Sequence, residues 1–134
     1  MAVAPRGLDT IQHLAFAATA SRNANLTGTG VDLKDYDGDV ILILDVAAGG
    51  TSTCTVTVQD SADNSTFANL SAEFARDGVA QAAGTVAFSQ VTTTASKQTI
   101  VFSKDGARRY VRVVSAEGGT HVYSVNGLAL KKYG

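Results

Sequence analysis

The sequence predicts an all-β domain, an antiparallel β-sandwich of jelly-roll type with about eight strands. Cys54, Val56 and Val58 alternate with Thr residues, so one face of that segment is apolar and the other wettable. A cluster of Asp, Ser and Asn residues follows, of the kind that reverses a chain, and an apolar pattern restarts at Phe67 and Leu70. Similar short segments recur along the chain, and none of them has a helical period.

The chain is predicted to begin with an arm that leads into a strand. Residues 1–13 hold the only proline and show a mixed pattern, so we expect an N-terminal arm outside the single β-sandwich domain of residues 14–134. Apolar and polar residues alternate over 13–20, which predicts the first strand.

The segment 40–46 is the most apolar run, and both of its faces are apolar until Asp45. A strand of this kind is covered on both faces, either by a second layer or by a subunit interface. The Gly-Gly pair within 47–52 favours a hairpin between this strand and the next one, at 53–59.

The second half of the chain repeats this scheme of short strands and turns. Further strands are predicted over the segments 67–74, 86–88, 99–103, 110–115 and 121–130. Turns are predicted at 76–78, 104–106 and 117–120, and the Gly-Gly pair of the last turn favours a type I′ hairpin.

The alternation along these strands also predicts which side chains point inward. The expected core includes Val56, Val58, Ile100, Phe102, Val111 and Val113. In the last strand Val125 lies on one face, and Gly127 is a candidate β-bulge ahead of Leu128 and Leu130.

Length and charge limit the partners of the chain. Its 134 residues suffice for one domain whose core needs neither disulfides nor metal. The net charge is −1 and the basic residues are scattered, so we expect no nucleic-acid partner. No apolar stretch approaches the roughly 18 residues of a membrane helix, so we expect no membrane partner either. Asp9, Gln12 and His13 interrupt any apolar run near the N-terminus, which predicts synthesis without a secretory signal.

The surface is predicted to be unusually neutral. Charged residues make up 17% of the chain, against about 25% in ordinary soluble domains, and Ala, Thr, Ser and Gly take their place. A surface of small neutral side chains suits a subunit that packs on neighbours. The alternative is that β-sandwiches simply favour Thr and Ser on their outer faces.

No residue pattern supports catalysis or a cofactor. The single cysteine, Cys54, has the parity of an inward-facing side chain, so we expect it to be buried and unreactive. A nucleophilic role would need a positioned histidine, and His13 and His121 are both distant in the sequence. Glu73 and Glu117 are the only glutamates and form no evident pair. We therefore expect no enzyme activity, no cofactor and no catalytic or metal-binding residues.

The acidic segment 35–39 is the one candidate for a cation site. Asp35, Asp37 and Asp39 alternate as in a calcium loop, but an EF-hand starting there would need Gly in place of Val40 and Glu in place of Val46. The segment is interpreted as an acidic turn ahead of a strand, and weak calcium binding by it stays open.

Two segments resemble a known class of protein. The run TVTVQDSADNSTF at 55–67 resembles the strand–turn–strand signature of small virion proteins of tailed bacteriophages. The run RRYVRVV at 108–114, followed by Gly-Gly-Thr at 118–120, is similar to a later strand and hairpin of those proteins. With this size and no coiled-coil or collagen repeat, the resemblance is to capsid cement, or decoration, proteins. Tail and head-tail connector proteins of similar size are the close alternatives.

The resemblance implies a set of partners and a location. Such a protein would be made in the host cytoplasm and would sit on the capsid exterior of the virion, where it bridges copies of the major capsid protein. We expect it to bind itself as well, as a dimer or alternatively a trimer, and the arm residues Arg6, Leu8 and Ile11 are the candidate capsid contacts. A carbohydrate-binding β-sandwich is a separate hypothesis, weakened by the absence of Trp and the low aromatic content of 7%.

Overall fold

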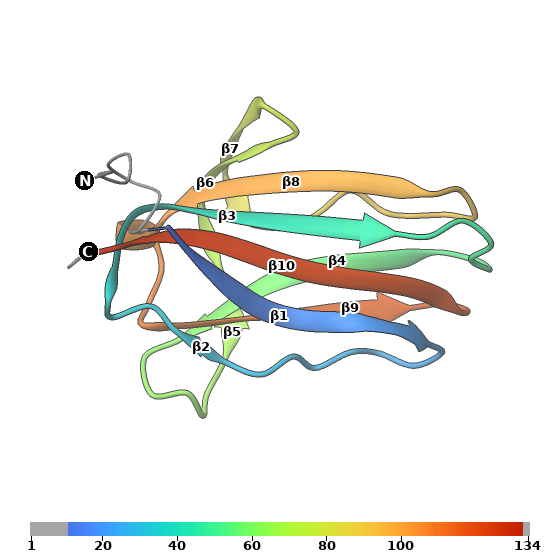
Figure 1. The fold of residues 1–134 in the computed structure, drawn as a ribbon, viewed down its shortest axis with the longest axis horizontal. Helices are drawn as coiled ribbons and strands as arrows, with labels where there is room; N and C mark the ends of the chain where they lie inside the picture. Colours follow the sequence, from blue (N-terminus) through green and yellow to red (C-terminus); the bar gives the residue numbers. More distant parts are fainter. Residues whose placement is uncertain (1–10, 133–134) are drawn as a thin grey trace, which may run out of the picture.

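The computed structural model describes residues 11–132, which form a sandwich of two antiparallel sheets (Figure 1). The larger sheet has the order β1-β10-β3-β8-β6-β7, with β1 Ile11–Arg22, β10 His121–Lys131, β3 Tyr36–Val46, β8 Ser96–Ser103, β6 Ser71–Arg76 and β7 Val79–Thr85. The smaller sheet has the order β2-β9-β4-β5, with β2 Val31–Asp32, β9 Tyr110–Glu117, β4 Cys54–Ser61 and β5 Ala68–Asn69. A 3-10 turn, η1 Lys104–Gly106, joins β8 to β9. None of the helical elements within 11–132 has the length and hydropathy of a bilayer-spanning segment.

The strand order is that of a jelly roll extended by two strands. Residues 86–91 lie along the edge of β4, with bridges from Thr57 to Ala87 and from Cys54 to Val91. Residues 86–91 and β5 thus share one edge of β4, with β5 paired at Gln59 and Asp60. Along the rest of β4 the smaller sheet has the order β2, β9, β4 and 86–91, and it faces β3, β8, β6 and β7. This is the double Greek-key arrangement of a jelly roll, and β1 and β10 widen its larger sheet. The predicted all-β sandwich is confirmed.

The core lies between the sheets, and the strand parities predicted for it are confirmed. All six side chains assigned to the core are at most 2% exposed: Val56, Val58, Ile100, Phe102, Val111 and Val113. Val58 stands directly opposite Val113, and Ile100 opposite Leu42. Because neighbouring side chains point to opposite faces, a slip of one residue in β4, β8 or β9 would expose the core side chains of that strand.

The first strand begins earlier than predicted. β1 starts at Ile11, which pairs with Leu130, so residues 11–13 belong to the sheet and not to an arm. Residues 1–10 lie outside the described part of the chain.

Both Gly-Gly hairpin predictions are wrong. β3 lies in the larger sheet and β4 in the smaller one, and β9 and β10 are likewise in different sheets. The Gly-Gly segments are therefore corners between layers, and Thr51 of one corner bridges Thr120 of the other. A type I′ turn needs positive φ at both central residues, whereas neither Gly118 nor Gly119 has one. The predicted turn at 76–78 does form such a hairpin, because Asp77 and Gly78 have φ of 52° and 81° between the paired residues Arg76 and Val79.

Gly127 is not a bulge. It stays in register with Leu14 on one side and Leu42 on the other, and the register shift between β10 and β3 falls between Ala129 and Leu130. The glycine instead makes room for an aromatic ring, because a Cβ there would lie 2.6 Å from Phe16 Cε2. Strand parity continues through Gly127, so Leu128 and Leu130 point to the outer face.

Candidate functional site

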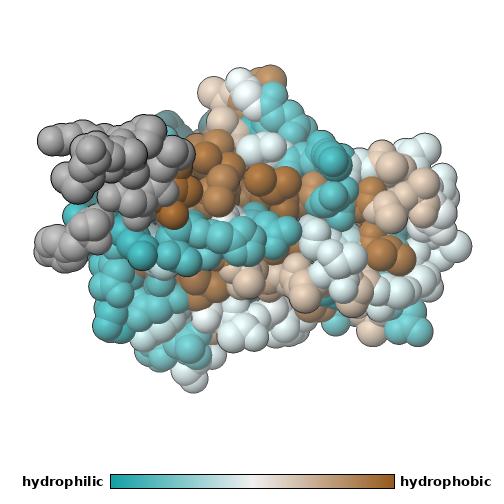
Figure 2. Space-filling model, in the orientation of Figure 1, coloured by the Kyte–Doolittle hydropathy of each residue, from teal (hydrophilic) through white to brown (hydrophobic). Residues whose placement is uncertain are grey.

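The outer face of the larger sheet carries an apolar row that runs across three strands. Leu128 on β10 pairs with Ile41 on β3, and Ile41 pairs with Val101 on β8. Residues paired in adjacent strands point to the same face, so their side chains lie side by side. Figure 2 views this face and shows apolar surface over β3 and β8 with a hydrophilic band beside it.

A groove of about 490 Å³ opens at the end of this row where β1 begins. Its lining residues are Ile11, Gly38, Asp39, Ile41, Leu128, Ala129 and Leu130. Ile11 and Leu130 are direct partners in the sheet, and each is 45% exposed. Apolar side chains from the first and last strands therefore meet at one open depression, of the kind that marks a binding surface.

The two-faced apolar strand is covered on one face by the protein itself. Val40, Leu42 and Leu44 are fully buried against the smaller sheet. On the other face Ile41 is half-buried and Ile43 is 36% exposed. Of the two predicted coverings, a second layer accounts for the inner face, and no element of residues 11–132 covers the outer one.

Of the predicted capsid contacts, the structure describes Ile11 and places it in this groove. Arg6 and Leu8 lie outside the described residues. The sequence did not identify Leu128 and Leu130 as site residues, because the bulge expected at Gly127 left the face of these two β10 residues unassigned. Strict alternation through Gly127 was the signal that would have identified them.

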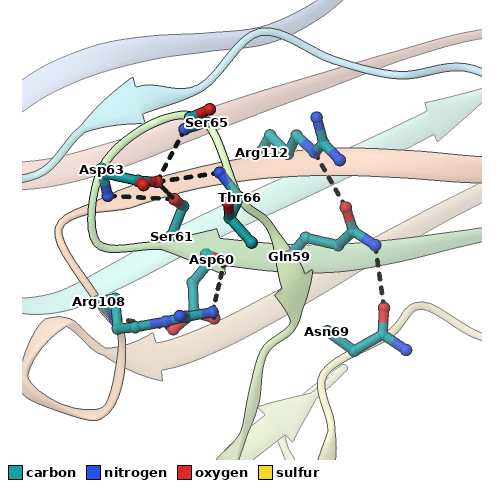
Figure 3. Close-up of polar contacts among 9 residues, drawn as sticks. All are labelled: Gln59, Asp60, Ser61, Asp63, Ser65, Thr66, Asn69, Arg108 and Arg112. Carbon is teal, nitrogen blue, oxygen red and sulfur yellow. Dashed lines mark hydrogen bonds and ion pairs between the residues drawn. The ribbon is translucent and has the colours of Figure 1, made fainter.

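The segment that resembles the virion signature forms a tight polar turn between β4 and β5 (Figure 3). The Asp63 Oδ1 atom accepts hydrogen bonds from the backbone N–H groups of Ser65 at 3.0 Å and Thr66 at 2.9 Å, and from Ser61 Oγ at 2.9 Å. These donors hold the pKa of Asp63 at about 2, because they stabilise its ionised form. Asn64 has a φ of 59°, in the left-handed region that Asn tolerates, so Asp63 and Asn64 both have a structural role in the turn.

Phe67, where the apolar pattern restarts, lies outside the core. It is half-buried beneath Arg112, whose guanidinium carbon lies 4.0 Å from the ring centroid, and Leu70 fills the core position instead. Arg112 Nε also donates to Gln59 Oε1 at 2.9 Å (Figure 3). The Arg112 side chain therefore links the Phe67 ring to the outer face of β4.

Asp60 and Arg108 connect the two signature segments. Arg108 donates to the Asp60 carboxylate through its backbone N–H and its Nη2, both at 2.9 Å, and through Nη2 to the Asp60 carbonyl at 2.8 Å (Figure 3). Asp60 is only 6% exposed, so these bonds compensate a largely buried carboxylate. The residues shared with the signature therefore build the end of the smaller sheet and form no catalytic arrangement.

The acidic segment does not assemble into a cation site. Asp35, Asp37 and Asp39 are all exposed, and within residues 11–132 their carboxylates are not among the side chains whose ligand atoms converge. Asp37 and Asp39 instead belong to the start of β3.

A buried polar cluster, which the sequence did not reveal, lies beneath the two corners. Ligand atoms of Cys54, Glu117 and His121 all lie within 4.8 Å of one another. Cys54 is 2% exposed, as predicted, and burial, with a further contribution from Glu117, raises the pKa of its thiol to about 12. His121, although distant from Cys54 in the sequence, lies beside it, and its fully buried side chain is paired with Glu117. The spacing of His121 four residues after Glu117 was a local signal, but Cys54 joins them only because the corners meet.

This cluster does not have the properties of a nucleophilic site. His121 Nδ1 lies 2.5 Å from Glu117 Oε1, and Nε2 lies 2.9 Å from the Thr92 carbonyl, so both ring nitrogens are engaged. A thiol with a pKa of about 12 stays protonated at neutral pH.

The fold has a counterpart among known structures. No family model matches the chain, and no curated protein does. The crystal structure of the SPBc2 prophage-derived protein YomS is similar, with a TM-score of 0.60 and 13% sequence identity over 90% of this chain and 93% of that one. At this identity the likeness establishes a shared fold, and the function must be argued from the surface of the molecule.

Proposed function

We propose that this chain is a non-enzymatic structural protein of a tailed-phage virion, a cement protein that binds the outside of the head and bridges major capsid proteins. The observation that carries the proposal is the apolar groove around Ile11, Leu128 and Leu130, which residues 11–132 leave open. An exposed apolar depression on an otherwise weakly charged domain favours stable attachment to another protein.

Two further observations support a phage origin. The sandwich has the fold of a prophage-derived protein along nearly its whole length. The residues that resemble the virion signature include Asp63 and Asp60, whose hydrogen bonds build the turn and fix its neighbouring strand.

Attachment would gain from multivalency. A single groove of this size offers modest binding energy, whereas an oligomer that engages several capsid proteins multiplies it through effective concentration. The proposed partners are therefore the major capsid protein and further copies of this chain, as a dimer or alternatively a trimer.

The proposal is tested with phage particles that lack the protein. Depleted heads should lose DNA at a lower temperature than complete heads, and purified protein added back should restore their resistance. Labelled protein should decorate the head surface. Unchanged heat resistance, or label confined to the tail, would overturn the cement role, and the second result would support a tail or connector protein.

A carbohydrate-binding module is less well supported. Sugar-binding faces use exposed aromatic rings, and the exposed large apolar residues among 11–132 are all aliphatic: Ile11, Ile43, Val79, Val122 and Leu130. Saturable binding of a glycan array by the purified protein would favour that module over the cement role.

A further inference from the structure

We propose that Cys54, Glu117 and His121 form a structural site for a zinc-class divalent cation that joins the two sheets. Cys54 and Glu117 belong to β4 and β9 of the smaller sheet, and His121 begins β10 of the larger one. Their ligand atoms already lie within 4.8 Å of one another. Thiolate, carboxylate and imidazole are the three ligand types that zinc takes in proteins.

The unsatisfied oxygen of Glu117 is the second observation. The Glu117 side chain is fully buried, and its Oε2 atom is the buried side-chain oxygen or nitrogen that has no hydrogen-bond partner within the described residues. A buried carboxylate oxygen without a donor is costly, and a cation would compensate it. Oε1, by contrast, is held by Gly119 N–H at 3.1 Å as well as by His121.

The orientation of His121 is that of a metal ligand. Its Nε2 atom lies 2.9 Å from the Thr92 carbonyl, which requires the proton on Nε2. Nδ1 lies against Glu117 Oε1, and the cation would replace the proton that these two atoms share in the metal-free protein. A metal-bound histidine usually donates its other ring N–H to a carbonyl or carboxylate in this way, which fixes the ring and its tautomer.

The charges balance when the site is loaded. A thiolate and a carboxylate carry two negative charges, and a divalent cation with neutral imidazole neutralises both. The Cys54 proton and the proton shared by His121 Nδ1 and Glu117 Oε1 are released to solvent as the metal bonds form.

In the folded protein the two interlayer corners cover the cluster and limit access of a cation to it. A Cβ on Gly50 would overlap the His121 ring, so the first corner lies directly on the imidazole and closes the cluster. We therefore expect loading during folding and slow exchange afterwards.

The test is to refold the full chain with Zn²⁺ or with a chelator, then to dialyse and measure bound metal. We expect one equivalent of zinc and a melting temperature several degrees above that of the chelated protein. Refolding with Co²⁺ should give a thiolate-to-cobalt charge-transfer band, which reports sulfur ligation directly. Cys54→Ala and His121→Ala should lose the metal, whereas His13→Ala, which removes an exposed histidine, should keep it.

The wild-type measurements decide the outcome even where a variant fails to fold. Absence of stoichiometric metal, absence of the cobalt band, or equal melting temperatures with Zn²⁺ and chelator would overturn the site. The cluster would then be a metal-free hydrogen-bonded group of His121 and Glu117.

Discussion

Thr51 and Thr120 join the two interlayer corners of the sandwich. Thr51 N–H donates to the Thr120 carbonyl at 2.9 Å, and Thr120 N–H donates to Thr51 Oγ1 at 2.9 Å. The corners come so close that a Cβ on Gly119 would overlap the Thr51 carbonyl oxygen.

Gly119→Ala should therefore destabilise the domain. The carbonyl belongs to the backbone, so it has little freedom to move, and overpacking of this kind costs about 1–3 kcal/mol. Gly84→Ala is the matched control, because the nearest atom to its Cβ is 3.9 Å away. Denaturant unfolding should show a loss of free energy of unfolding for the first variant and none for the second. If Gly119→Ala and Gly84→Ala have equal free energies of unfolding, the two corners can move apart without destabilising the domain.

The turn at Asp63 should give a stability contribution that depends on pH. Asp63→Asn removes the ionised acceptor of three donors, so at neutral pH the melting temperature should fall by a few degrees. Asp37→Asn makes the same charge change at an exposed carboxylate and should have a smaller effect.

The sign of the pH effect follows from the lowered pKa. Asp63 titrates near 2 in the folded state, against an ordinary value of 3.8, so the unfolded state binds more protons in that range. The contribution of Asp63 is complete above about pH 4 and disappears as the pH falls through 2. The melting temperatures of wild type and Asp63→Asn should therefore converge in acid. A constant difference down to pH 2 would contradict this account.

Cys54 should resist thiol reagents in the native protein. Its pKa of about 12 leaves almost no thiolate at pH 8, and its side chain is 2% exposed. A chromogenic disulfide reagent should find one thiol in guanidinium and essentially none without it. In metal-free protein, ionisation of the raised thiol should also lower stability as the pH rises from about 9 to 12. Rapid native labelling would mean that the end of β4 opens readily.

The sequence predicted the strands and their inward faces because alternation is a local property. Val56, Val58, Val111 and Val113 could each be assigned from their immediate neighbours. Sheet membership is not local. A Gly-Gly pair fits both a hairpin and a corner, and only the partners of β3 and β4 distinguish the two.

The same limit applies to the sites. Cys54 and His121 come together only through the contact between corners, which no spacing in the chain encodes. The groove depends on the pairing of the first strand with the last, through Ile11 and Leu130. An assumed bulge at Gly127 was enough to leave the face of its β10 residues unassigned.

Deletion of residues 2–10 should leave the sandwich folded and weaken capsid attachment. Val3 and Leu8 are the only large apolar residues of this segment, so we expect it to contribute little to the core, whereas Ile11 pairs in β1 and must be kept. Circular dichroism and melting should match those of the full chain, and binding to depleted heads should fall. If the shortened protein binds depleted heads with undiminished affinity, residues 2–10 are not part of the capsid interface.

Leu130→Ser should weaken attachment to heads by roughly tenfold. A half-exposed Leu that becomes buried at an interface contributes about 1–2 kcal/mol, and 1.4 kcal/mol corresponds to a factor of about 10 in affinity. Val79→Ser is the control, because Val79 is 62% exposed and lies in β7 at the opposite edge of the same sheet. Both variants should fold with similar melting temperatures, since neither side chain is in the core. Binding to depleted heads, measured by sedimentation over a range of protein concentrations, should separate them. If the two variants bind equally well, the groove formed by β1, β3 and β10 is not the attachment surface.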